Sequence, residues 1–228
     1  MITNSRKTNS ACIILAAGQS QRFGTNKLLS SFKGSSLFFY VIDLVLSFKI
    51  AHKIIIVVRE RDERNLRKKY CNNKDVEVVL GGKNRIESTL NGLLSLDTKK
   101  YQYVYVHDGA RPIISKRDFS VLKREMMSKD LDGVVLYTRA YDSTVLYEEK
   151  IENNHYLDKN KVLHLKTPHL YRVDSILESL LKYKRRGQEL ENAQILSEQG
   201  KKIGFVEGSI DNIKVTYKKD ISIIKKLV

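Results

Sequence analysis

The sequence lacks tryptophan and has only two prolines and two cysteines among its 228 residues. Cys12 and Cys71 do not form a CxxC pair and the five histidines lie far apart, which argues against a disulfide scaffold and against a zinc site. No apolar run approaches the ~20 residues of a membrane span, so we expect no membrane contact. Few, unpaired cysteines are typical of a reducing compartment, and we therefore expect a cytoplasmic protein.

Acidic residues are scarce relative to basic ones. The 41 Lys and Arg against 26 Asp and Glu give a formal net charge of +15. Such a surplus predicts attraction to anions, whether nucleotides, sugar phosphates or nucleic acid. However, the lysines are scattered rather than gathered in stripes, and AT-rich codon usage also produces a chain rich in Lys, Asn, Ile and Tyr. The net charge therefore does not by itself identify a partner.

The composition, 42% hydrophobic and 29% charged, is that of an ordinary globular protein. Short apolar runs alternate with stretches of helical periodicity, and continuous apolar strands between helices predict a parallel sheet covered on both faces. The expected fold is a doubly wound, mostly parallel α/β sheet. The predicted strands are Ala11–Leu15, Lys53–Val58, Val76–Leu80, Tyr103–His107, Gly133–Tyr137 and Ile203–Val206.

Residues 138–165 interrupt this alternation. The segment is polar, with strand-like pieces at Ser143–Tyr147 and Val162–Leu165. It predicts a β-arm inserted into a single domain that spans residues 1–228, with a surface loop as the alternative. Because two thin strands do not bury both faces by themselves, the arm favours packing against a second subunit, as in a homodimer.

Ligands of open α/β sheets bind beyond the carboxyl ends of the strands. The first predicted strand is followed by AAGQSQRFG, residues 16–24, and then by Lys27. Small residues let backbone N–H groups approach a phosphate, while Arg22 and Lys27 supply positive charge. The loop has neither the G-x-G-x-x-G of dinucleotide-binding proteins nor the Gly-Lys-Ser/Thr of a Walker A loop. It predicts a phosphate-binding loop of another kind.

Three further motifs follow the same logic. GGKNRIES, residues 81–88, opens a helix whose N-terminus favours anions or polar base edges. HDGARP, residues 107–112, places Asp108 where Mg²⁺ is held by one protein oxygen and substrate phosphates, whereas His107 is expected to be structural. DNIKVT, residues 211–216, places the cation Lys214 just before the last predicted helix.

These motifs, together with the Thr167-Pro168 step, resemble the 2-C-methyl-D-erythritol 4-phosphate cytidylyltransferase family of the non-mevalonate isoprenoid pathway. The resemblance extends from about Ala11 to Leu227. It implies a nucleotidyltransferase-like Rossmannoid domain with a dimerising β-arm, CTP as co-substrate and Mg²⁺ as cofactor. The implied reaction transfers CMP from CTP to the sugar-alcohol phosphate and releases pyrophosphate, without any nucleic-acid partner.

The resemblance also implies roles for individual residues. The positions that match catalytic residues are Arg22, Lys27, Lys159 and Lys214. Those that match nucleotide-binding residues are Ala16, Ala17, Gly18, Gly82 and Ser88. Those that match substrate-binding residues are Asp108, Arg111, Ser143 and Thr167, with Asp108 also linked to the metal. The arm is expected to make the site composite, with Lys159 and Thr167 reaching the nucleotide site of a partner.

Several positions depart from the family pattern. Lys159 stands where an arginine is usual and loses its bidentate fork, His169 replaces a glutamine, and Leu190 replaces a threonine. On the arm, either Ser143 or Thr144 matches the family's threonine.

Two alternative functions stay open. One is a ribitol 5-phosphate cytidylyltransferase of the same fold. The other is a basic, non-catalytic nucleic-acid-binding protein, which the motifs at strand ends disfavour.

Overall fold

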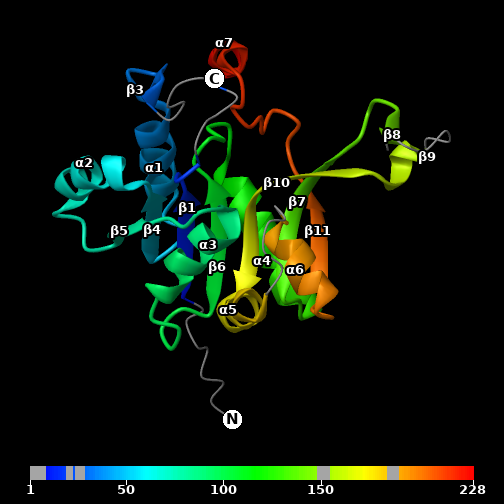
Figure 1. Ribbon diagram of the computed structural model, residues 1–228, viewed down its shortest axis with the longest axis horizontal. Helices are drawn as coiled ribbons and strands as arrows, with labels where there is room; N and C mark the ends of the chain where they lie inside the picture. Colours follow the sequence, from blue (N-terminus) through cyan, green and yellow to red (C-terminus); the bar gives the residue numbers. More distant parts are fainter. Residues whose placement is uncertain (1–8, 19–22, 24–28, 148–154, 184–189) are drawn as a thin grey trace.

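The computed structural model describes residues 9–18, 23, 29–147, 155–183 and 190–228. Its centre is a seven-stranded sheet with the order β11-β7-β10-β6-β1-β4-β5 (Figure 1). β10 runs antiparallel to both of its neighbours, and the other pairs are parallel. The predicted doubly wound α/β fold is confirmed. The strands are β1 (Ser10–Leu15), β4 (Lys53–Val58), β5 (Val76–Leu80), β6 (Tyr103–Asp108), β7 (Gly133–Arg139), β10 (Leu163–Arg172) and β11 (Ile203–Glu207).

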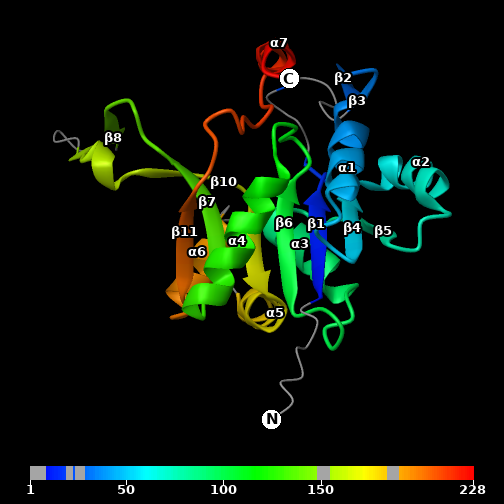
Figure 2. The ribbon, with the colours of Figure 1, turned by 180° about the vertical axis from the view of Figure 1, so that it is seen from behind.

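Helices cover both faces of this sheet, as the two opposite views in Figures 1 and 2 show. One face is covered by α1 (Leu37–Phe48), α2 (Glu60–Tyr70) and α4 (Lys116–Lys129). The other face is covered by α3 (Arg85–Leu94), α5 (Val173–Lys182) and α6 (Asn192–Glu198). No helix within the described part of the chain is long and apolar enough to cross a membrane.

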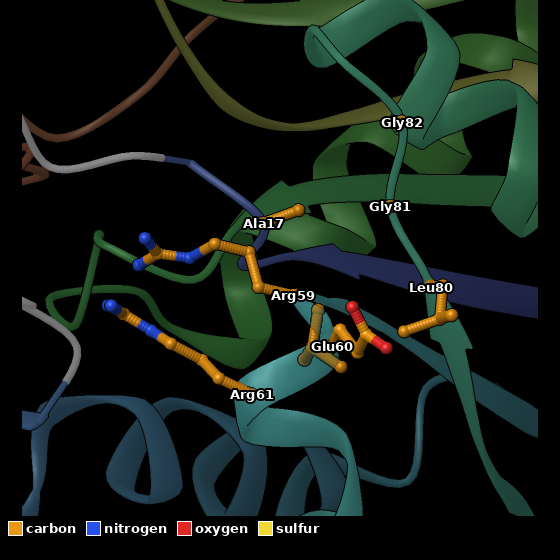
Figure 3. A pocket seen from close by; sticks show the side chains of 8 residues that line it. Ala17, Arg59, Glu60, Arg61, Leu80, Gly81 and Gly82 are labelled. Atoms are coloured by element: carbon orange, nitrogen blue, oxygen red, sulfur yellow. The ribbon is translucent and has the colours of Figure 1, made fainter.

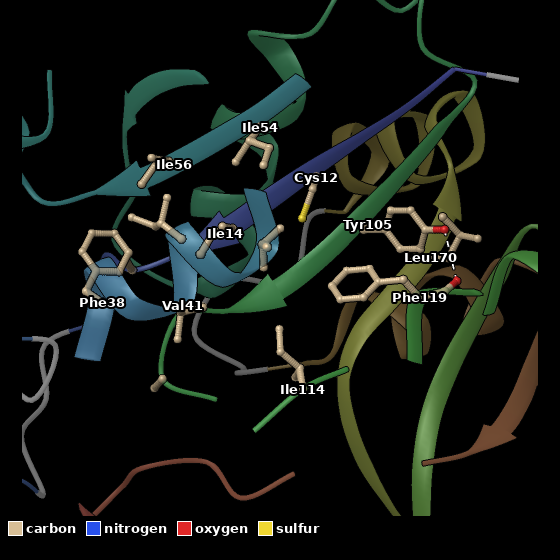
Figure 4. Close-up of a cluster of buried hydrophobic side chains, with 14 of the residues drawn as sticks. Cys12, Ile14, Phe38, Val41, Ile54, Ile56, Tyr105, Ile114, Phe119 and Leu170 are labelled. Atoms are coloured by element: carbon tan, nitrogen blue, oxygen red, sulfur yellow. Dashed lines mark hydrogen bonds between the residues drawn. The ribbon is translucent and has the colours of Figure 1, made fainter. Parts of the chain in front are cut away.

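β1 and β4 are apolar at every position after their first residue, because each of their faces meets a helical layer. In β1, Cys12 and Ile14 point into the core beneath α1 and α4, while Ala11 and Ile13 point into the core beneath α3 and α5. Figure 4 shows Ile14 among the side chains of the first core, where the Tyr105 hydroxyl also donates to a backbone carbonyl of α4 over 3.2 Å. Burial on both faces explains why the sequence shows continuous apolar runs rather than alternation.

A third, smaller core lies at the carboxyl end of the sheet. The short hairpin β2 (Ser31–Phe32) and β3 (Ser35–Ser36) turns through Lys33 and Gly34, whose φ angles are 48° and 75°. Two consecutive positive φ angles match the twist of a tight hairpin, and glycine adopts the second without strain. The hairpin packs with the last helix, α7 (Lys218–Lys226), around Phe32, Leu37, Val215 and Ile224.

Two elements differ from the sequence-based prediction. β10 continues from the predicted Val162–Leu165 through Arg172 and lies inside the sheet, although it contains Pro168. The register with β7 shifts between Lys166 and His169, so that the proline occupies a bulge where no ladder hydrogen bond is needed.

The arm contains β8 (Thr144–Leu146), β9 (His155–Leu157) and a short 3-10 helix, η3 (Lys159–Lys161). The two short strands form their own antiparallel sheet and project from the domain, at the right of Figure 1. β7 runs to Arg139 and β10 starts at Leu163, so the part that leaves the sheet is residues 140–162, slightly shorter than the predicted 138–165.

Candidate active site

Three of the sequence motifs meet at one edge of the sheet, because β1, β4, β5 and β6 are parallel and end side by side. Backbone hydrogen bonds join the ends: the Ala16 N–H donates to Val57 over 2.8 Å, and the Gly109 N–H donates to Leu15 over 2.9 Å. The Gly81 N–H donates to the last residue of β4 over 2.8 Å. The segments that follow β1, β5 and β6 therefore line a common edge.

The glycine pair after β5 lies against the loop after β1. A Cβ atom built on Gly81 would lie 2.3 Å from the Ala17 Cβ, so only glycine fits. The N–H of Gly82 donates to the buried Ser88 hydroxyl over 3.1 Å, and Asn84 caps α3 by accepting from the Glu87 N–H over 2.8 Å. A cavity of about 410 Å³ opens between Ala17 and the two glycines (Figure 3).

Asp108, at the end of β6, is the centre of a charged cluster. Its Oδ2 atom lies 2.8 Å from Lys214 Nζ and 3.5 Å from Arg111 Nε, and its Oδ1 atom lies 3.5 Å from Arg85 Nε. Arg85 also reaches Glu191 Oε2 over 2.9 Å. The Asp108 side chain is 9% exposed. Three cations thus surround one nearly buried carboxylate.

These cations control the charge of Asp108. Burial alone would raise the pKa of the carboxyl, but Lys214, Arg85 and Arg111 outweigh it and hold that pKa well below its usual range. Nearby, burial and the charge of Arg111 lower the pKa of Lys166. With Lys166 included, four basic side chains face two carboxylates, and the surplus of positive charge suits a phosphate ligand.

A chain of buried hydrogen bonds fixes the backbone on either side of Asp108. The Asp108 N–H donates to Thr167 Oγ1 over 3.0 Å, and Thr167 Oγ1 lies 3.1 Å from His107 Nδ1. His107 Nε2 lies 3.1 Å from the Arg111 carbonyl, which can only accept. Nε2 therefore carries the proton and Nδ1 accepts from the Thr167 hydroxyl. Burial lowers the pKa of His107 to about 4, which keeps this neutral form at pH 7 and agrees with the structural part expected for it.

Asn212 connects the segment before α7 to the same cluster. Its side-chain amide donates to the Thr167 carbonyl over 2.7 Å, and its own carbonyl accepts from Arg111 Nη1 over 2.9 Å. Asn212 is 1% exposed, so this connection is inside the protein. It places Lys214, two residues further on, beside Asp108. Residues more than a hundred positions apart are thereby held in one site.

A family model described as 2-C-methyl-D-erythritol 4-phosphate cytidylyltransferase matches residues 10–228, nearly the whole chain. The chain belongs to this family. It is a nucleotidyltransferase of isoprenoid biosynthesis by this membership, so the nucleic-acid-binding alternative is wrong.

Individual relatives agree with the family model. The 2-C-methyl-D-erythritol 4-phosphate cytidylyltransferase of Aquifex aeolicus is 31% identical over 95% of this chain and 96% of its own length. A bifunctional enzyme of Pelagibacter ubique is also 31% identical over 93% of this chain, which spans only 56% of that protein. The crystal structure of 4-diphosphocytidyl-2C-methyl-D-erythritol synthase from Anaerococcus prevotii has the same fold, with a TM-score of 0.84 at 22% identity over 96% of each chain.

The structure brings together only some of the residues that resemble cytidylyltransferase site residues. Those at the common edge are Ala16, Ala17, Gly18, Gly82, Ser88, Asp108, Arg111, Thr167 and Lys214. Arg22 and Lys27 lie outside the described residues. Ser143 and Lys159 are exposed on the arm, apart from the Asp108 cluster. Thr167 was expected to reach the nucleotide site of a partner subunit. Instead, its hydroxyl accepts a hydrogen bond from the Asp108 N–H of its own chain, so Thr167 belongs to the site of its own subunit.

The Mg²⁺ that the cytidylyltransferase family implies was expected on Asp108, and the arrangement does not fit that role. Both carboxylate oxygens already face cations, so a divalent ion there would meet three positive charges. The described residues also contain no group of three or more His, Cys, Asp or Glu side chains that could hold a metal. Asp108 is better suited to orient Lys214, Arg111 and Arg85.

Replacing Asp108 with asparagine tests this assignment. We expect Asp108→Asn to lower the free energy of unfolding by about 3–5 kcal/mol, because three cations lose their counter-charge in a nearly buried site. The Mg²⁺ concentration for half-maximal residual activity should stay within twofold. Urea unfolding and a metal titration measure the two effects, and Asp130→Asn, which breaks a surface ion pair, is the control. A large shift in the Mg²⁺ midpoint would restore Asp108 as a metal ligand.

Arg85 lies in the GGKNRIES motif, and no role was predicted for it from the sequence. In the structure this first residue of α3 bridges Asp108 and Glu191, which stands immediately before α6. It therefore links the start of α3, just after the glycine pair, to the Asp108 cluster. The available signal was its position: it opens a helix directly after a glycine pair at a strand end, as phosphate-binding cations often do.

Proposed function

We propose that this protein transfers CMP from CTP to 2-C-methyl-D-erythritol 4-phosphate and releases pyrophosphate. The observation that carries this proposal is the Asp108 cluster, where basic side chains outnumber carboxylates beside the glycine-bounded cavity. The family match over residues 10–228 supports both substrates. Nucleotide and sugar phosphate then occupy two neighbouring halves of one edge of the sheet.

The reaction requires positioning more than proton transfer. An ionised phosphate oxygen of the sugar phosphate attacks the α-phosphorus of CTP, a new P–O bond forms, and the bond to the bridging oxygen breaks as pyrophosphate leaves. No general base is needed, because the attacking oxygen carries its negative charge near pH 7. Lys214 and Arg111 orient this dianion and reduce its repulsion from the triphosphate. By resemblance, Arg22 and Lys27 stabilise charge at the α-phosphorus.

The nucleotide half uses backbone and small side chains. Ala16, Ala17 and Gly18 leave β1 with little side-chain bulk. Gly82 lies across the cavity from Ala17, and its N–H donates to the buried Ser88 hydroxyl behind it. We assign the cytosine to the Gly82 side and the phosphates to the loop after β1. Mg²⁺ supplies charge neutralisation to the nucleotide phosphates when it is bound, and Asp108 is not among its ligands in this proposal.

A pyrophosphate-release assay tests the function directly. CTP and a divalent cation are supplied with either methylerythritol phosphate or ribitol phosphate. We expect turnover with methylerythritol phosphate and at least a tenfold lower kcat/KM with ribitol phosphate. Absence of release with either sugar under every divalent ion would contradict the enzyme proposal, whereas a preference for ribitol phosphate would contradict only the sugar.

The arm is proposed to join two copies of the chain. It carries large exposed apolar side chains that its own domain does not cover, including Tyr156 at 81% exposure and Leu146 at 53%. A two-stranded sheet of this size is marginal without further packing. In such a dimer Lys159 and Ser143 of one arm approach the other subunit's site.

We also propose that the protein is cytoplasmic. Its two free cysteines, one of them exposed, support a reducing compartment.

A charge on the arm should separate the subunits. We expect Tyr156→Asp to convert the dimer to a monomer at micromolar concentration, because an unpaired carboxylate would be buried in the interface. Sedimentation velocity measures the change. Leu181→Asp, on the exposed face of α5, is the matched control and should leave the mass unchanged. A wild-type protein that is already monomeric and fully active at assay concentration would refute the dimer.

A further inference from the structure

Two arginines line the nucleotide cavity and have no role in the motifs described above. Arg59 follows the end of β4, and Arg61 lies in the first turn of α2. Both face the cavity that Ala17, Gly81 and Gly82 bound (Figure 3). β4 pairs with β1, so these side chains enter the site from the strand next to the loop of residues 16–18.

The guanidinium of Arg59 lacks an adequate acceptor. Its Nε and Nη2 atoms are buried and make no hydrogen bond, and its side chain is 22% exposed. The nearest carboxylate oxygen, Asp62 Oδ2, lies 3.9 Å from Arg59 Nε and 3.8 Å from Arg61 Nε, too far for a hydrogen bond to either. Buried donors without acceptors are destabilising, so a ligand acceptor is expected at this position.

The two guanidinium groups also repel each other. Burial and the charge of Arg61 lower the pKa of Arg59, in spite of Asp62. Figure 3 shows both groups reaching to the same side of the cavity, away from Gly81 and Gly82. A guanidinium group binds phosphate oxygens through two parallel N–H donors, and two such groups reach the same side of this cavity. The natural occupant is a polyanion that neutralises both.

We infer that Arg59 and Arg61 form an anion subsite for the terminal phosphates of the bound nucleoside triphosphate, and for pyrophosphate after the transfer. The inference rests on the proposed function, in which the cytosine lies on the Gly82 side of the same cavity. The arginines reach away from Gly82 and so meet the other end of the nucleotide. The subsite thus recognises how many phosphates the nucleotide carries.

Calorimetric titration of CTP, CDP, CMP and pyrophosphate at fixed Mg²⁺ tests the subsite. We expect Arg59→Gln to weaken CTP and pyrophosphate at least tenfold and CMP less than twofold, and Arg59→Lys to fall between wild type and Arg59→Gln. Arg61→Gln should weaken CTP about threefold, because this side chain is 57% exposed. Arg64→Gln, on the exposed face of the same helix, is the control and should bind all four ligands as wild type does.

Equal losses for CTP and CMP would overturn the inference, because they would place Arg59 at the base or ribose. Unchanged binding of all ligands in a variant with wild-type thermal stability would overturn it as well. Both of these outcomes leave the proposed function intact. A wild-type protein that binds no CTP contradicts the proposed function instead, so the two failures are distinguishable.

Discussion

Lys214→Ala is expected to lower kcat/KM for the sugar phosphate by about 10²–10³, mostly through kcat. Lys214 Nζ uses one donor on Asp108 over 2.8 Å, and its side chain is 40% exposed toward the open edge of the sheet. An ammonium group has three donors, so at least one remains for a phosphate oxygen. Loss of the Lys214 ammonium group removes a preorganised positive charge next to the reacting phosphates. It also leaves the negative charge of Asp108 balanced by two cations instead of three.

Steady-state kinetics with varied sugar phosphate measure this effect. Lys218→Ala, four residues further along on an exposed turn of α7, removes the same charge outside the cluster and should change kcat/KM less than twofold. If Lys214→Ala keeps kcat within twofold of wild type while Lys218→Ala does the same, the Asp108 cluster is not where the transfer occurs.

Acidification is expected to destabilise the protein strongly between pH 6.5 and 4. Burial lowers the pKa of His107 to about 4 and, with the charge of Arg85, lowers that of His169 to about 3. In the unfolded chain both histidines bind a proton below pH 6.5, while the folded protein leaves them neutral. The unfolded state then holds two more protons, so the free energy of unfolding falls by about 2.7 kcal/mol per pH unit, or about 5 kcal/mol at pH 4.5.

Urea unfolding across this pH range checks the slope, and one substitution separates the two histidines. His169→Gln removes one titrating group and should reduce the slope by about half, even if it changes the stability at pH 7. The hydroxyl of Tyr171, 2.9 Å from His169 Nδ1, offers the replacement amide a partner. A slope that is identical in wild type and His169→Gln would show that His169 does not hold a lowered pKa.

The sequence predicted the strands whose residues are mostly apolar, and it predicted only the start of β10, where polar residues interrupt the apolar pattern. β4 has the predicted limits, Lys53–Val58, because its apolar run is buried from Ile54 to its end. The edge strand β5 also has the predicted limits, Val76–Leu80, although Val78 is its only buried residue. Most of β10 was not predicted as a strand, because His164, Lys166 and Pro168 interrupt its run of apolar residues. Its place in the sheet is set by pairing with β6 and β7, which no local periodicity encodes.

The candidate site was also predicted only in part from the sequence. Motifs at the ends of β1, β5 and β6 were visible because they follow strongly apolar strands. The environment of Asp108 could not be predicted from the sequence. A lone aspartate after a strand looks the same in a sequence whether it binds a metal or faces three cations. That distinction depends on Arg85 and Lys214, which lie 23 residues before it and 106 residues after it in the numbering. Only tertiary structure brings such distant side chains together.

β10 also divides the chain into parts with very different tolerance to insertion. The outer arm, residues 140–162, is solvent-exposed over most of its described length, so gain or loss of residues there leaves the sheet in register. Within Leu163–Arg172, a single inserted residue would reverse which side chains face each helical layer and turn Thr167 away from Asp108. Related sequences should therefore vary in length on the arm and keep a constant count from its base to the site.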